Sequence, residues 1–497
     1  MAKFDRASGL LLHPTSLPGP NGIGELSSFA YRWIDTLVTA RQRVWQVLPL
    51  GPTGYGNSPY QTISSFAGNP LLIDLDWLVA EGLLEPADLR GRAELPQDRV
   101  DFARLVPWKW EILHRVGCTF EQRASTGLLD AFENFCRQHE EAWLEDFAFF
   151  LALKNHFGGV AWNEWPAAIR LRQPKAMRQW RSQLRGEIQC HKVIQFLFFH
   201  QWQALKNYAN QKGIQIFGDI PIYATYDSAD VWAHQELFQL DEAGLPLVVA
   251  GVPPDYFSRT GQLWGNPIYD WEKMRENGYR WWIARIAHAL RLVDVVRVDH
   301  FRGFEAYWEV PFGEETAING RWVKGPGASF FEAVLNALGD IPIVAEDLGE
   351  ITPEVLALRD QFGFPGMKIL QFAFASGPSD PFLPHNYTRN FVVYTGTHDN
   401  DTTHGWYMAA PQHEKEYCHR YLGGVPRDIA WALMRLASAS VGVWCVFPVQ
   451  DVLSLGSEAR MNYPGRAEGN WAWRMPPNAL QPHHIESLAE MSATYGR

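Results

Sequence analysis

The sequence contains eight short runs of β-branched or Leu-rich residues, which end in Gly, Pro, Asp or His and recur between helix-like stretches. Runs of this length and composition are typical of β-strands. Several are apolar throughout instead of alternating with polar residues, as expected for parallel strands that are covered on both faces. The expected strands are residues 10–13, 44–50, 214–222, 293–301, 341–348, 367–374, 391–397 and 441–449.

The stretches between the strands predict helices. Thr352 is a candidate N-cap, Pro353 follows at the first helical position, and Gly363 with Pro365 ends the segment, so one helix fits between the fifth and sixth strands. Eight parallel strands with intervening helices predict an α/β fold of the (β/α)8 TIM-barrel type, because the right-handed crossover rule leaves few other topologies.

The strand pattern extends over nearly the whole chain, which favours a single barrel over residues 1–497 although the length would allow about three domains. The segment after the second strand, approximately residues 70–190, has helical periodicity and is expected to form a helical insertion. Residues of about 224–272, after the third strand, are rich in Pro, Gly, Asp and aromatic residues without clear periodicity. We expect an irregular insertion there, which could cover the barrel mouth as a substrate loop.

Charge and composition exclude several partners. There are 44 basic and 55 acidic residues, a net charge of −11, and no Lys/Arg-rich block, so nucleic acid is not an expected partner. The N-terminal segment lacks a signal-peptide pattern, and no apolar run is long enough to span a membrane. The five cysteines are odd in number, scattered and never in a C-x-x-C pair, which favours a reducing compartment. We therefore expect a cytoplasmic protein of undetermined oligomeric state, with no membrane partner.

Acidic residues recur where the expected strands end, which is where a TIM barrel builds its active site. Asp219, Asp299 and Glu346 lie near the ends of three of the expected strands, and Asp399 follows a fourth. Arg297 is two residues before Asp299 and would project to the same side of the strand, so one such pair could be purely structural. Several carboxylates at successive strand ends instead favour an active site.

Two carboxyl groups on either side of a bond are what glycosidic bond cleavage requires, and their pKa values must differ. Arg297 is expected to favour the ionised form of Asp299. Glu346, in a drier setting, is expected to stay protonated as the acid.

Longer strings around these residues resemble those of a known enzyme family. The strings are DHFRGFEAYW (299–308), AEDLG (345–349), YTGTHDNDT (394–402), HPTSLPG (13–19), GPTGYG (51–56), SPYQ (58–61), GVPPDYF (251–257), WGNP (264–267) and RMNYPG (460–465). They are similar to those of the 4-alpha-glucanotransferases called amylomaltase or disproportionating enzyme, glycoside hydrolase family 77, and they cover nearly the whole chain.

The resemblance implies transfer of α-1,4-glucan segments from a maltooligosaccharide or starch-type donor to the 4-hydroxyl of a glucan or glucose. It implies that Asp299 is the nucleophile of a covalent intermediate, Glu346 the general acid and base, and Asp399 a third carboxylate that holds the distorted sugar. Because the family retains the α-configuration, Asp299 and Glu346 should lie about 5 Å apart. The implied residues of the adjoining sugar subsite are Tyr60, Asp219, Arg297, His300 and His398.

Further candidate substrate contacts lie in loop-like sequence, where an aromatic ring can cover the apolar C–H face of a sugar. We expect the loop at 253–257 to close over bound glucan and exclude water, which would favour transfer over hydrolysis. These additional candidates are Tyr55, Asp255, Tyr256, Phe257, Trp264, Asn266 and Asn462.

No cofactor or catalytic metal is expected. The 16 histidines include no H-E-x-x-H motif, and the glycines of 51–56 lack the order of a phosphate-binding loop. Two alternatives stay open: a retaining α-amylase-type hydrolase that uses water as acceptor, and a non-catalytic glucan-binding barrel. The presence of all three carboxylates argues against the second, because binding alone needs no acid opposite a nucleophile.

Overall fold

The computed structural model describes residues 4–254, 258–466 and 468–497. Eight parallel strands form one sheet in the order β10-β11-β12-β1-β2-β3-β6-β9. β1 pairs with both β2 and β12, so the first and last of these strands are neighbours. In chain order the strands are β1 (Ala7–Leu11), β2 (Val44–Gln46), β3 (Gln215–Ile220), β6 (Val295–Val298), β9 (Ile343–Ala345), β10 (Gly366–Ile369), β11 (Phe391–Tyr394) and β12 (Trp444–Pro448).

The sheet curls until its two end strands, β9 and β10, approach each other. The N–H of Ala345 donates to the carbonyl oxygen of Pro365 at 2.8 Å. The carboxylate of Asp347 accepts the N–H of Met367 at 2.7 Å and also pairs with Arg359. The sheet is therefore nearly closed into a barrel, and the predicted TIM-barrel fold is confirmed: each of the eight expected strands overlaps an observed one.

Both faces of the strands are buried, which explains their continuous apolar sequence. Along β6, Val295 packs into a cluster that fills the barrel, whereas Val296 packs into the larger cluster shared with the surrounding helices. Gly9 on β1 is needed for the approach to β2, because a Cβ atom there would lie 2.3 Å from the carbonyl oxygen of Val44.

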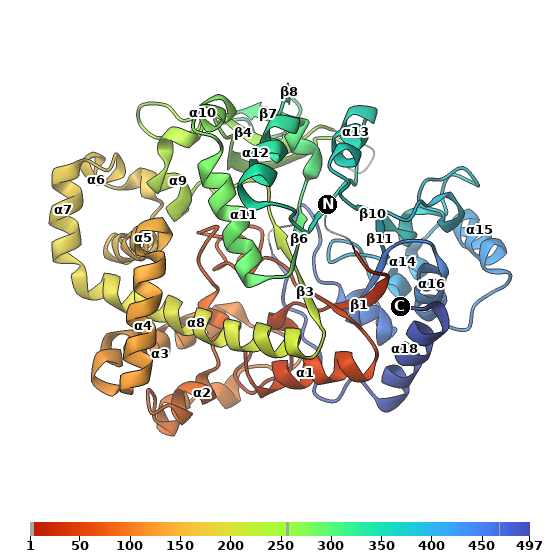
Figure 1. Ribbon diagram of the computed structural model, residues 1–497, viewed down its shortest axis with the longest axis horizontal. Coiled ribbons are helices and arrows are strands. Elements are labelled where there is room, and N and C mark those ends of the chain that lie inside the picture. The colour runs from red at the N-terminus through yellow and green to blue at the C-terminus, as the bar shows by residue number, and fades with distance from the viewer. Residues whose placement is uncertain (1–3, 255–257, 467) are drawn as a thin grey trace.

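The chain between β2 and β3 is mainly helical and lies to one side of the barrel (Figure 1). Its longest helix, α8, leads back into β3. A disulfide joins Cys118 of α3 to Cys190 of α8. The cysteine spacing did not predict this bond. The cysteine pattern therefore no longer favours a reducing compartment. The helices are α2 (Leu75–Ala80), α3 (Phe102–Arg123), α4 (Thr126–His139), α5 (Glu145–His156), α6 (Ala167–Arg170), α7 (Pro174–Gln183) and α8 (Arg185–Gln211).

A second, antiparallel sheet has the order β5-β4-β7-β8. It combines β4 (Val248–Val252) and β5 (Gln262–Pro267) with β7 (Ala306–Pro311) and β8 (Arg321–Lys324). The segment 224–272, which we expected to be irregular, thus contains two strands. The alternation within it is too short and too interrupted by Gly and Pro to reveal them, and β4 gains its partner β7 from beyond β6.

The other helices pack around the barrel. α13 begins at Pro353, as predicted, whereas only short 3-10 turns connect β10 to β11. No helix in the described ranges is both long and apolar enough to cross a membrane. These helices are α1 (Ser28–Thr39), α9 (Ala229–Ala233), α10 (Trp271–Glu276), α11 (Arg280–Leu292), α12 (Ala328–Leu338), α13 (Pro353–Gln361), α14 (Thr403–Ala409), α15 (Gln412–Leu422), α16 (Ile429–Ala439), α17 (Val449–Val452) and α18 (Pro482–Tyr495).

Candidate active site

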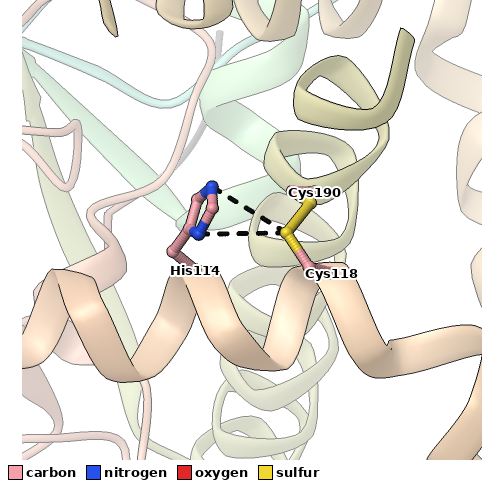
Figure 2. Close-up of side chains that lie close together, drawn as sticks. All are labelled: His114, Cys118 and Cys190. Atoms are coloured by element: carbon pink, nitrogen blue, oxygen red, sulfur yellow. Dashed lines mark hydrogen bonds between the residues drawn. A yellow bond between two sulfur atoms is a disulfide. The ribbon is translucent and has the colours of Figure 1, made fainter.

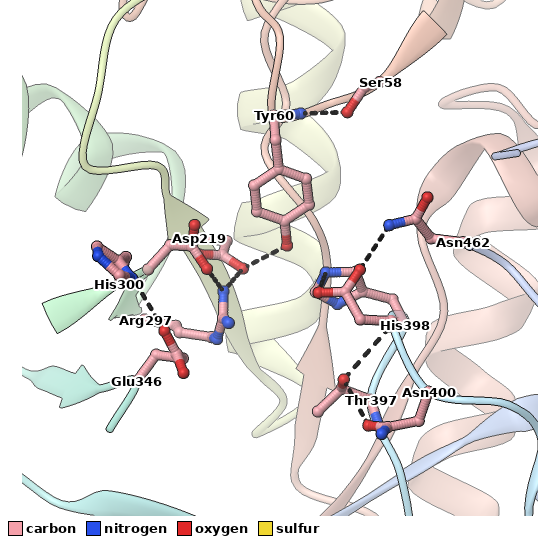
Figure 3. A network of polar contacts seen from close by, with 12 residues as sticks. Ser58, Tyr60, Asp219, Arg297, His300, Glu346, Thr397, His398, Asn400 and Asn462 are labelled. Atoms are coloured by element: carbon pink, nitrogen blue, oxygen red, sulfur yellow. Dashed lines mark hydrogen bonds and ion pairs between the residues drawn. The ribbon is translucent and has the colours of Figure 1, made fainter. Parts of the chain in front are cut away.

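The carboxyl ends of four barrel strands bring acidic side chains to one mouth of the barrel, and Figure 3 labels two of them, Asp219 and Glu346. Asp219 lies within β3, Asp299 directly follows β6, Glu346 directly follows β9, and Asp399 lies in the loop after β11. Since parallel strands end at the same edge of a barrel, side chains that are distant in sequence meet here. In the view of Figure 3, Tyr60 lies between the Arg297 and His398 sides of this network.

Arg297 links two of the carboxylates. Its Nη1 atom lies 2.6 Å from Oδ2 of Asp219 and 2.8 Å from Oδ1 of Asp299. The hydroxyl of Tyr60 donates to the same Asp219 oxygen at 2.8 Å. The Arg297 side chain is 4% exposed and that of Asp219 is fully buried. Such a buried charge is tolerated only when it is paired, and the pairing in turn fixes the direction of the Asp299 carboxylate.

Glu346 is held by two backbone groups. One carboxylate oxygen accepts the N–H of His300 at 2.8 Å, and the other accepts the N–H of Leu348 at 2.9 Å. The left-handed backbone of His300, with φ of 50°, directs that N–H toward Glu346. Burial raises the pKa of Glu346 to about 8, against the opposing effect of Arg297, and the negative charge of Asp299 adds to the rise. Glu346 is therefore mainly protonated at neutral pH.

Asp299 titrates below Glu346. Burial raises its pKa to about 6, while Arg297 acts to lower it. The expected effect of Arg297 is thus present but is outweighed by burial, so the pKa is not depressed as the sequence suggested. At neutral pH the pair still consists mainly of an ionised Asp299 and a protonated Glu346, which is the division that glycosidic cleavage requires.

Asp399 is the most strongly acidic of the three. Burial opposes its ionisation, but His398 and Asn462 together lower its pKa well below the usual range. Nε2 of His398 lies 3.3 Å from Oδ2 of Asp399, and the Asn462 amide donates to Oδ1 at 2.6 Å. The side chain is 46% exposed, so an ionised carboxylate faces the open space at the mouth.

Aromatic and imidazole rings form the surroundings of these carboxylates. Tyr60 stacks on His398 with ring centroids 5.0 Å apart, and Trp471 lies 5.9 Å from each of them. Trp264 meets His300 edge-on at 4.8 Å. Burial lowers the pKa of His300 to about 3, so its ring is neutral, and its Nε2 atom has no hydrogen-bond partner among the described residues. This nitrogen is therefore a buried polar atom whose hydrogen-bonding capacity is unused within the described part of the chain.

The residues expected to contact substrate divide into three groups. The first group belongs to the cluster described above and consists of Tyr60, Asp219, Arg297, His300, His398, Trp264 and Asn462. Tyr55 is 75% exposed and instead lines a separate hollow of about 570 Å³, while Asn266 is buried and donates to the carbonyl oxygen of Ala224 at 3.0 Å. Asp255, Tyr256 and Phe257 lie outside the described residues, so the closing loop remains a prediction.

Two residues of the cluster were not among the expected ones. Arg460 donates to the backbone carbonyl of Asp399 at 2.7 Å and to that of Asn462 at 2.7 Å, and so links the two segments that carry these acidic and amide groups. Arg460 could have been identified from the sequence, because it lies in the family-like string at 460–465. Trp471 has a left-handed backbone, with φ of 63°, in a segment without periodicity, so no sequence pattern marked it.

The positive charge between Asp219 and Asp299 comes from a side chain of the protein itself. The position between Asp219 and Asp299, where two carboxylates could share a cation, is occupied by the guanidinium of Arg297. The arrangement therefore provides an acid, a nucleophile and hydrogen-bonding groups from its own side chains.

Comparison with known proteins agrees with this geometry. A family model described as 4-alpha-glucanotransferase, glycoside hydrolase family 77, matches residues 12–480. The chain is 54% identical to a 4-alpha-glucanotransferase of Thermus thermophilus over 498 residues, 99% of each chain. It is 45% identical to the chloroplastic/amyloplastic 4-alpha-glucanotransferase of Solanum tuberosum, over 99% of this chain and 86% of that protein. An amylomaltase from Streptococcus agalactiae, solved in complex with acarbose, aligns with a TM-score of 0.96 at 41% identity over 99% of each chain.

Proposed function

Because the chain belongs to the 4-alpha-glucanotransferases of glycoside hydrolase family 77, we propose how its own residues carry out the transfer. The enzyme transfers α-1,4-glucan segments between glucan chains. We infer that maltooligosaccharides and starch-type glucans are its donors, and that the 4-hydroxyl of a second glucan or of glucose is its acceptor.

The observation that carries this mechanism is the meeting of Asp299 and Glu346 at the carboxyl ends of β6 and β9, with the pKa of Glu346 raised above that of Asp299. In the first step Glu346 donates its proton to the glycosidic oxygen, and a carboxylate oxygen of Asp299 attacks the anomeric carbon. The bond to the leaving glucan breaks, and a glycosyl ester forms on Asp299. In the second step the acceptor hydroxyl gives its proton to Glu346 and attacks the same carbon, which releases Asp299. Two inversions retain the α-configuration.

The charge on Asp299 also controls when Glu346 is protonated, because it changes the pKa of Glu346 between the two steps. In the free enzyme the negative Asp299 helps to raise the pKa of Glu346. Glycosylation converts Asp299 to an uncharged ester, so this effect disappears while Arg297 remains nearby. The pKa of Glu346 then falls, which favours the ionised base that the second step needs.

The other members of the cluster would hold the sugar. We propose that Asp399, His398 and the free nitrogen of His300 bond the hydroxyls of the ring next to the cleaved bond, and that their bonds strengthen as the ring distorts. Trp264, at the edge of His300, offers an apolar face for a neighbouring sugar.

Incubation with maltotriose tests the proposed acceptor. Transfer produces glucose and a series of longer oligosaccharides while the number of reducing ends stays constant. Hydrolysis adds one reducing end per event and shortens the chains. A rise in reducing ends that matches the glucose released would support the alternative hydrolase, and an unchanged maltotriose would leave binding alone. The Asp299→Asn variant is the control for enzyme-dependent products.

A further inference from the structure

A second group of reactive side chains lies between α3 and α8, outside the barrel mouth (Figure 2). His114 and Cys118 are one helical turn apart on α3, and Cys190 faces them from α8. Cys190 is buried, whereas Cys118 is exposed, so solvent reaches the group from one side. None of these residues takes part in the glycosyl transfer described above.

The two helices approach closely at this point. A Cβ atom on Gly117 would lie 2.7 Å from the carbonyl oxygen of Cys190, so the missing side chain allows the contact that places the two sulfurs together. Both ring nitrogens of His114 lie 3.8 Å from Sγ of Cys118. One donor atom from each of the three residues lies within 4.8 Å of the others.

Glu187 supports the imidazole. It precedes Cys190 by three residues on α8, and its Oε2 atom lies 2.9 Å from Nε2 of His114. A carboxylate bonded to one ring nitrogen leaves the other as a ligand and increases its basicity, an arrangement that recurs around zinc-binding histidines.

We propose that His114, Cys118 and Cys190 bind one Zn²⁺ ion when the two cysteines are reduced, with Glu187 orienting His114. Zinc bonds of about 2.3 Å to sulfur and about 2.0–2.1 Å to nitrogen, at tetrahedral angles, place neighbouring donor atoms about 3.6–3.8 Å apart. The His114–Cys118 spacing of 3.8 Å already agrees with this. The two sulfurs must separate, and breaking their bond allows that. Thiolate and imidazole ligands together suit zinc better than the hard cations Ca²⁺ and Mg²⁺.

The disulfide and the metal-bound state exclude each other. A dithiol reductant supplies two electrons and two protons to the disulfide and itself becomes a cyclic disulfide, which leaves Cys118 and Cys190 as thiols. Zn²⁺ then binds both sulfurs as thiolates, and the two thiol protons are released to solvent. Either state connects α3 to α8, so the cross-link would be covalent under oxidising conditions and metal-mediated under reducing conditions.

Cobalt is a suitable probe because tetrahedral Co²⁺ replaces Zn²⁺ and its thiolate bonds absorb light. The full-length protein would be reduced with a dithiol, desalted without oxygen and titrated with Co²⁺. We expect one Co²⁺ per chain, a thiolate-to-cobalt charge-transfer band, intense visible bands of tetrahedral cobalt, and loss of all of them on addition of one equivalent of Zn²⁺. The oxidised protein should show none of these bands.

The variants separate this site from other thiols. Cys118→Ser and Cys190→Ser should each bind Co²⁺ at least tenfold more weakly and lose charge-transfer intensity, and His114→Gln should bind about 10–100-fold more weakly while keeping its two cysteines. Cys136→Ser is the matched control, because Cys136 is a free cysteine on α4. Absence of Co²⁺ binding by the reduced wild-type protein would overturn the proposal, as would a spectrum unchanged in Cys118→Ser or His114→Gln with native circular dichroism.

Discussion

At the scale of single residues, the proposed mechanism depends on two carboxyl groups whose pKa values lie on either side of neutrality. Asp299 must be ionised to attack, and its pKa is raised to about 6. Glu346 must be protonated to assist departure of the leaving glucan, and its pKa is raised to about 8. Below the first value the nucleophile is lost, and above the second the acid is lost.

We therefore expect the rate of glucosyl transfer to follow a bell-shaped pH profile with limbs near pH 6 and pH 8 under substrate-limited conditions. Initial rates with maltotriose from pH 4.5 to 9.5 would measure this profile. Conversion of Glu346 to Gln should reduce turnover by about 10²–10⁴-fold and abolish the alkaline limb.

The two carboxyl variants should respond differently to an activated donor. A maltosyl fluoride needs little acid assistance, so it should restore formation of the glycosyl ester in Glu346→Gln but not in Asp299→Asn. Near-normal turnover of maltotriose by both variants would refute the assignment of both roles.

Arg297 provides a second test at this scale. Its removal leaves the buried carboxylate of Asp219 and the partly exposed carboxylate of Asp299 without their cation, so Arg297→Met should lower the free energy of unfolding by about 3–5 kcal/mol at neutral pH. The pKa of Asp299 should rise further, which would move the acidic limb of the activity profile upward.

Urea denaturation and the pH profile together measure these effects. Arg104→Met is the matched control, since Arg104 and its partner Glu94 are 51% and 75% exposed, and such a pair contributes about 0–1 kcal/mol. Equal losses of stability in the two variants would contradict the role given to Arg297.

At the scale of elements, the weakest part of the barrel wall is the junction of β9 and β10. Asp347 joins these strands through Met367 and Arg359, and it is the residue next to Glu346. Asp347→Asn should lower the free energy of unfolding by about 1–3 kcal/mol, because a buried charged partner is lost. We also expect a lower kcat with little change in KM, since displacement of Glu346 affects the chemical step more than binding.

Asp360→Asn is the control for this junction. Asp360 bonds the same Arg359 side chain but is 60% exposed and connects no two strands. Its replacement by Asn should therefore lower the free energy of unfolding by only about 0–1 kcal/mol. Chemical denaturation and steady-state kinetics of the two variants would compare them. A kcat as low in Asp360→Asn as in Asp347→Asn would contradict a specific role for Asp347.

Some elements of the fold could be predicted from the sequence and others could not. The barrel strands were predictable because both of their faces are buried, which produces short continuous apolar runs such as 391–397. The carboxylates were predictable because each one follows such a run. β4 was not predictable, since its partner β7 lies beyond β6 and no local alternation distinguishes it. Likewise, nothing in the sequence indicated that Cys118 and Cys190, which are 72 positions apart, are in contact.

At the scale of the whole molecule, we expect the choice between transfer and hydrolysis to depend on how far water is excluded from the mouth of the barrel. We predict that replacing residues 253–257 by two glycines raises the share of hydrolysis, because water then reaches the glycosyl ester more easily. Reducing ends formed per glucose released from maltotriose measure this share. A similar shortening of the exposed turn at 423–426 is the control, and an unchanged share in the 253–257 variant would contradict the covering loop.

The pairing of β1 with β12 has a consequence for how the barrel is assembled. Gly9 lies beside Val446, so β1 receives its second neighbour only after 437 further residues have been made. At synthesis rates of about 5–20 residues per second, that neighbour appears roughly 20–90 seconds later. During this interval one edge of β1 is open to incorrect pairing. The order of synthesis therefore leaves this edge of β1 unpaired until β12 emerges and completes the barrel.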